Sequence, residues 1–99
     1  DAYDDGGRTM KRIMTVCGPG PGPGLLVEMN IQKILRELGR EQEFETCHSS
    51  VYEMSAMDAD YFIVANDLKD SIPPVEHLIV LESLIDEEEL REKLTTFLS

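Results

Sequence analysis

The chain has 99 residues, of which 41% are hydrophobic, enough for one domain with a modest core. Its formal net charge of -11 argues against binding to nucleic acid or to an anionic membrane surface, since both would repel it. Its two cysteines are too few for a disulfide framework. No apolar run approaches the roughly 20 residues of a membrane span, and no signal peptide is visible. We therefore expect a cytoplasmic protein.

Residues 1–10 lack periodicity and an apolar face. We expect them to be a disordered tail, either artificially added or an upstream extension with Met10 as the natural start. Residues 11–99 are then expected to form a single domain. The β-branched run at 11–17 predicts a first strand. The Gly/Pro segment 18–24 predicts a loop, because its three prolines exclude both a helix and a ladder strand.

Residues 25–38 predict a helix, because apolar residues recur at three- and four-residue spacing and Gly39 follows, where a glycine commonly ends a helix. The expected apolar stripe consists of Leu26, Met29 or Asn30, Ile34, Leu35 and Leu38. Residues 43–47 alternate with period two and predict a second strand. Residues 49–57 fit either a short helix or a loop.

The continuous apolar run at 61–65 predicts a third strand that is covered on both faces. A short helical turn is expected at 66–71, before two prolines, and a fourth strand at 77–81. Strands that alternate with helices predict an α/β fold, with a parallel sheet and helices on both faces.

An acidic segment opens the last predicted helix. Asp86 is a suitable N-cap, and Glu89 stands three residues further on, as in a capping box. Glu89 and Lys93 have the spacing of an ion pair on one helix face. The expected apolar stripe of this helix consists of Leu90, Leu94, Phe97 and Leu98.

Reactive residue types are predicted at one edge of the sheet. Cys17 ends the first predicted strand, Cys47 and His48 end the second, and Asn66 follows the third. Ligands of open α/β sheets bind beyond the carboxyl ends of the strands. A helix N-terminus there can bind an anion, and it favours the reactive thiolate form of a thiol that faces it.

Several loop chemistries are excluded by the residues present. A dinucleotide fingerprint would need glycine at Pro23 or Leu25, and the Gly-Lys-Ser/Thr of a Walker loop is absent. A phosphatase of the Cys-x5-Arg type would need arginine at position 23. Cys47 and His48 are adjacent, which is not a zinc-ligand spacing. We therefore expect neither a metal nor a cofactor.

Of the loop chemistries considered, one remains: a cysteine nucleophile that accepts a phosphoryl group and passes it on. Glycine lets the backbone approach a phosphate closely. The backbone amides expected to surround the phosphate oxygens are those of Gly18, Gly20, Gly22, Gly24 and Leu25.

Most of the chain, residues 11–98, resembles the IIB component of the bacterial sugar phosphotransferase system, of the ascorbate branch and similar lactose and galactitol branches. The resemblance is carried by residues 13–18, Gly20, Gly22, Leu25, Leu26, Met29, 34–39, 59–64 and 85–90. It implies a Rossmann-like three-layer fold with a four-stranded parallel sheet of order 2-1-3-4.

The resemblance also implies an activity, that of a protein-phosphocysteine–sugar phosphotransferase. Cys17 would be phosphorylated by a phosphohistidine of a IIA partner. It would then phosphorylate a sugar or sugar acid bound by the membrane component IIC. Residues 18–25 would form the phosphate loop, and no cofactor is implied.

The loop departs from the family pattern Cys-Gly-x-Gly-x-Gly-Ser/Thr-Ser, because Pro23 and Gly24 occupy the two hydroxyl positions. Weaker phosphate binding is therefore expected. This departure favours an alternative, a degenerate IIB-like module that acts as a regulatory or interaction domain without phosphotransfer. A third interpretation is a redox pair of Cys17 and Cys47, if the first two strands are neighbours. His48 also fits an ordinary rim residue.

Overall fold

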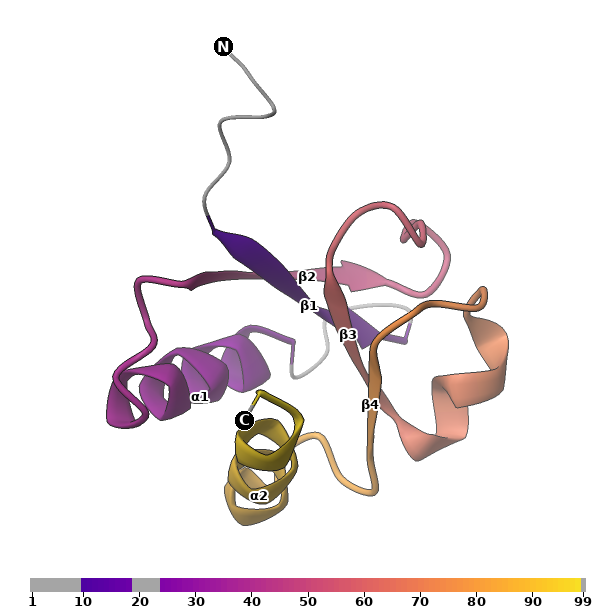
Figure 1. Cartoon of the computed structure of the whole chain (residues 1–99). Helices are drawn as coiled ribbons and strands as arrows, with labels where there is room; N and C mark the ends of the chain where they lie inside the picture. The colour runs from indigo at the N-terminus through magenta and orange to yellow at the C-terminus, as the bar shows by residue number, and fades with distance from the viewer. Residues whose placement is uncertain (1–9, 19–23, 99) are drawn as a thin grey trace, which may run out of the picture.

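The computed structural model describes residues 10–18 and 24–98. Its elements are β1 (Lys11–Cys17), α1 (Gly24–Glu37), β2 (Phe44–Ser50), β3 (Tyr61–Ala65), the 3₁₀ helix η2 (Asn66–Ser71), β4 (Leu78–Leu81) and α2 (Glu87–Leu98). The strands form one parallel sheet of order β2-β1-β3-β4 (Figure 1), which confirms the expected α/β class and strand order.

The two faces of the sheet are covered by different kinds of structure. Both α-helices lie on one face (Figure 1), where their apolar residues pack on Ile13, Ile63 and Ile79 in one core cluster. On the other face, Met14 and Phe62 belong to a second cluster that is covered by η2 and by the segments around it. The sheet is therefore the middle of three layers, and β1 lies at its centre.

The buried side of α1 differs from the predicted stripe at its amino end. Ile34 and Leu35 are buried as expected, but Leu26 is 48% exposed and Met29 is 57% exposed. Val27 and Ile31 fill the core in their place. The amino end of α1 has three consecutive apolar residues, so the sequence left open which face would be buried, and the buried face is the one on which Val27 and Ile31 continue the three- and four-residue spacing of Ile34 and Leu35. Leu38 is also exposed, contrary to the prediction.

The carboxyl end of α1 is closed as Gly39 predicts. Gly39 has φ of 72°, a left-handed conformation that favours glycine. Its N–H donates to the Arg36 carbonyl (3.1 Å), and the Arg40 N–H donates to the Leu35 carbonyl (2.8 Å). This is the Schellman pattern, which satisfies carbonyls that the helix leaves without partners.

Two strand boundaries differ from the predictions. β2 runs to Ser50 rather than ending at Cys47, because the polar residues at its carboxyl end continue the ladder beside β1. A turn follows, so residues 49–57 form no helix. β4 begins at Leu78 rather than His77, although the His77 carbonyl already accepts a hydrogen bond from the Phe62 N–H (2.9 Å).

The last helix begins at the predicted N-cap, but the capping box is only half formed, because the Glu89 carboxylate accepts from the N–H groups of Glu82 and Ser83 and the Asp86 N–H donates to the Ser83 carbonyl (3.2 Å). The Glu89 N–H donates to Asp86 Oδ1 (3.1 Å), and Lys93 pairs with Glu89 (2.8 Å). Buried residues of α2 are Leu90, Leu94 and Leu98. Phe97 is instead partly exposed and packs edge-to-face on Tyr61, with ring centroids 5.7 Å apart.

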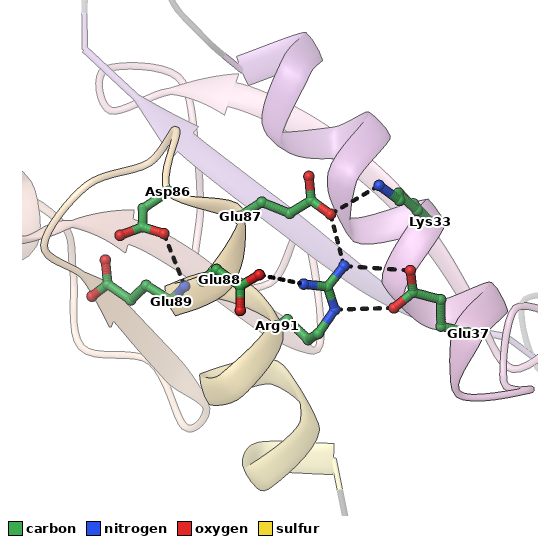
Figure 2. Close-up of polar contacts among 7 residues, drawn as sticks. All are labelled: Lys33, Glu37, Asp86, Glu87, Glu88, Glu89 and Arg91. Atoms are coloured by element: carbon green, nitrogen blue, oxygen red, sulfur yellow. Dashed lines mark hydrogen bonds and ion pairs between the residues drawn. The ribbon is translucent and has the colours of Figure 1, made fainter.

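An ion-pair network joins the two α-helices on the outside of the core (Figure 2). The Arg91 guanidinium donates two hydrogen bonds to the Glu37 carboxylate (3.0 and 3.3 Å) and one to Glu87 (2.7 Å). Glu87 also pairs with Lys33 of α1 (3.0 Å). These partners raise the pKa of Arg91 and lower the pKa of Glu87. The network links α2 to α1 at the edge of the apolar core that the two helices share.

Candidate functional site

Cys17 is the last residue of the central strand β1, as predicted. Its backbone pairs with Ser50 of β2, and its carbonyl accepts a hydrogen bond from the Val51 N–H (2.8 Å). Side chains alternate along a strand, so Cys17 faces the same side as Ile13, toward the α-helices. It is only 6% exposed, and this burial raises the pKa of its thiol. The reactive thiolate therefore needs hydrogen-bond donors around it.

The predicted phosphate loop is described at its two ends. Gly18 follows β1 directly, and a Cβ added there would lie 3.9 Å from Leu68 Cδ1, which is an ordinary contact. Packing against the described residues therefore does not require glycine at this position. Gly20 and Gly22 lie outside the described residues. Gly24 is the first residue of α1 and Leu25 the second, so the loop leads into a helix amino terminus (Figure 1), whose first N–H groups have no partner within the helix.

Cys47 does not lie at the rim with Cys17, contrary to the prediction. It pairs with Met14, three residues before Cys17, and packs against the core cluster on the opposite face of the sheet. Its sulfur lies 3.8 Å from the Ile13 carbonyl oxygen, and burial raises the pKa of its thiol. Both thiols are free. Their opposite orientation contradicts the juxtaposition that a Cys17–Cys47 redox pair requires.

His48 also lies before the end of β2, opposite Thr15. Its Nδ1 is 2.7 Å from Glu28 Oε1 of α1. One helical turn further on, Gln32 Nε2 donates to Thr46 Oγ1 (2.8 Å). These two pairs hold the outer side of α1 on the edge strand, so His48 has a structural contact that its sequence position did not indicate.

Asn66 follows β3 directly, as predicted, and it is exposed. β3 is the neighbour of β1 on the side away from β2, with Val64 beside Val16. Asn66 therefore lies at the same edge of the sheet as Gly18, at the carboxyl ends of the strands.

Exposed apolar side chains also follow the strand ends at this edge, and the sequence analysis did not identify them as a surface feature. They belong to the start of α1 after β1, the turn after β2, and the turn after β4. The residues are Leu25, Leu26, Met29, Tyr52 and Ile85. The apolar pattern alone could not show this, because it predicted burial for Leu26 and Met29.

The other end of the sheet has a separate cavity of about 310 Å³, with Lys11, Asp60 and His77 in its lining. These residues lie at or just before the amino ends of strands, so the cavity is not part of the Cys17 site. Within residues 10–18 and 24–98, no three His, Cys, Asp or Glu side chains are grouped to hold a metal ion. Among the helices of the described segments, none has both the length and the apolar character needed to cross a membrane.

Comparisons with known proteins agree with this arrangement. The family described as "PTS system, Lactose/Cellobiose specific IIB subunit" matches residues 12–96, which include Cys17 and its loop. The chain is also 26% identical over 88 residues to the ascorbate-specific PTS system EIIB component of Mycoplasma pneumoniae, covering 87% of this chain and 93% of that protein. The chain therefore belongs to the family of IIB subunits of the sugar phosphotransferase system.

Proposed function

We propose that this chain is a phosphocarrier that accepts a phosphoryl group on Cys17 from a phosphohistidine of a IIA partner. It then transfers the group to a sugar or sugar acid bound by a membrane IIC transporter, from the cytoplasmic side. Membership in the IIB family supports the general role of a phosphocarrier in sugar uptake. The observation that carries the assignment to Cys17 is its place at the carboxyl end of β1, directly before the loop that enters α1.

The two transfers are displacements at phosphorus. In the first, the Cys17 thiolate attacks the phosphoryl group, an S–P bond forms, and the P–N bond to the donor histidine breaks. In the second, a sugar hydroxyl attacks and releases its proton to solvent, an O–P bond forms, and the S–P bond breaks to return the thiolate. Charge on the transferring oxygens needs preorganised donors. The N–H groups of Gly18 and of the α1 amino terminus at Gly24 and Leu25, with those of Gly20 and Gly22, are the proposed donors.

The carboxyl edge of the sheet, where β1 ends at Cys17, carries exposed apolar residues that suit two successive protein partners. The exposed apolar residues Leu25, Leu26 and Met29 lie on the helix that follows the loop, and Tyr52 and Ile85 follow the ends of β2 and β4. An apolar surface at a reactive thiol excludes water from the transfer when a protein partner covers it. A thiol that is nearly buried in the free protein is consistent with chemistry that takes place only in such a complex.

The test is phosphorylation of the purified chain by phosphorylated IIA proteins of the lactose/cellobiose and ascorbate types, followed by mass analysis. We expect one added phosphoryl group on the wild type and on Cys47→Ser, and none on Cys17→Ala. Cys47→Ser is the matched control because Cys47 lies on the opposite face of the sheet. No adduct on the wild type, or an equal adduct on Cys17→Ala, would contradict the proposal.

A further inference from the structure

A buried hydroxyl lies next to the Cys17 position on β1. Thr15 is fully buried, and in the part of the chain that the structure describes its Oγ1 is the one buried side-chain oxygen without a hydrogen-bond partner. Burying a hydroxyl without a partner is unfavourable, whereas a valine of nearly the same shape would have no such penalty. The fold therefore gains nothing from this oxygen through the contacts of the described residues.

The pleat of β1 places the hydroxyl on the same side as the thiol. Residues two apart in a strand share one face, so Thr15 and Cys17 both face the α-helices, as Ile13 does. Across the sheet, Thr15 has His48 on one side and Ile63 on the other. Ile63 is apolar, and His48 contacts Glu28 through its Nδ1. The next residue toward the rim on this face of β1 is Cys17.

We propose that Thr15 is a positioning residue for Cys17, whose hydroxyl donates a hydrogen bond to the sulfur when the thiol is ionised. The thiol proton leaves to solvent, Thr15 keeps its own proton, and no covalent bond of Thr15 changes. A threonine hydroxyl can rotate to donate in this way, and hydrogen bonds to a charged acceptor are stronger than those to a neutral one. The proposal explains why a buried oxygen without a partner stands two residues before the thiol.

The experiment measures alkylation of Cys17 by iodoacetamide as a function of pH, with peptide mass analysis to separate Cys17 from Cys47. Thr15→Val is expected to raise the pH midpoint of Cys17 alkylation by about one unit, which is about tenfold less thiolate at neutral pH. Thr15→Ser keeps the hydroxyl and is expected to restore the wild-type midpoint. Cys47 is an internal control, because it packs on the opposite face of the sheet, and its midpoint is expected to be the same in every variant.

Stability separates this role from a structural one. Removing an unpaired buried hydroxyl is expected to leave the Tm of Thr15→Val equal to the wild type or higher, while the reactivity of Cys17 falls. Thr15→Ala, a second variant without the hydroxyl, must shift the midpoint in the same direction. A wild-type midpoint in Thr15→Val, or a shift in Thr15→Ser as large as in Thr15→Val, would overturn the proposal.

The assay contains no phosphoryl donor, so its outcome is independent of whether the chain transfers phosphate. The importance of Thr15 for phosphotransfer rests on the proposed function. A shifted alkylation midpoint together with no phosphorylation of the wild type would support the role of Thr15 and contradict the phosphocarrier role.

Discussion

At the scale of single residues, Glu89 is the described carboxylate whose contacts change its pKa most clearly. It accepts hydrogen bonds from the N–H groups of Glu82 (2.7 Å) and Ser83 (3.1 Å) and pairs with Lys93 (2.8 Å). These contacts, the Glu82 N–H first, lower its pKa from 4.5 to about 2. Since the folded pKa is lower than the unfolded one, Glu89 stabilises the fold above pH 4.5, and this contribution is lost as the pH falls toward 2.

We therefore expect Glu89→Gln to lower the free energy of unfolding by about 1–2 kcal/mol at neutral pH, because a neutral amide is a weaker acceptor. The difference from the wild type should shrink between pH 4.5 and about 2, as urea titrations at several pH values would show. Glu88→Gln is the control, because Glu88 is 90% exposed and its contact with Arg91 is 3.4 Å long. An equal loss in both variants, or a difference that does not change with pH, would contradict this explanation.

At the scale of elements, the end of α1 depends on the backbone of one residue. Gly39 has φ of 72°, and a Cβ added there would meet no atom of residues 10–18 or 24–98 within 4 Å. A side chain at this position would therefore cost only backbone energy, about 1–2 kcal/mol for an L-residue in the left-handed region. We expect Gly39→Ala to lower the free energy of unfolding by about 1 kcal/mol, and Gly39→Asn to lower it less.

Urea denaturation of these variants, beside Gln42→Ala in the same connection, measures the effect. Gln42 is exposed, so its substitution is expected to change stability by less than about 0.5 kcal/mol. If Gly39→Ala were as stable as Gln42→Ala, the left-handed conformation would not be what ends α1. The result is relevant to the candidate site, because the other end of α1 begins at Gly24, after the segment that follows Cys17.

At the scale of the whole molecule, the excess of negative charge opposes the compact state. Twenty acidic residues face nine basic ones, and exposed ion pairs such as Arg91–Glu37 contribute little individually. Salt screens both the repulsion between like charges and the attraction within ion pairs, so the larger of the two decides whether the Tm rises or falls with salt. We expect the Tm to rise by a few degrees between about 0.02 M and about 0.3 M NaCl, because screening relieves more repulsion than attraction.

Arg91→Gln sharpens this test, because it removes a cation from the bridge between the helices and leaves the net charge one unit more negative. Its Tm is expected to be lower than the wild type at low salt and to rise more steeply with salt. Differential scanning calorimetry over a NaCl series measures both slopes. A Tm that falls with salt would show that the ion pairs outweigh the repulsion.

The sequence alone determined the order of the elements and the class of the fold. Local signals predicted the strands at 11–17 and 61–65, a short helical turn at 66–71, the Asp86 cap and the Gly39 end of α1. Proline and glycine act through their own backbone preferences, so they indicate local structure directly, and a short β-branched run bounded by turn residues is typical of a strand. The same local reasoning predicted that a cysteine would end the first strand just before a loop.

Only the tertiary structure decided which side chains share a surface. The register of β2 against β1 places Cys47 beside Met14, on the opposite face of the sheet from Cys17. A shift of this register by one residue would turn each side chain of the strand to the other face. Packing chose Val27 over Leu26 for the core and left an apolar surface beside the predicted phosphate loop. The unpaired hydroxyl of Thr15 is likewise a property of long-range packing. These features depend on residues far apart in the chain, and no local pattern encodes them.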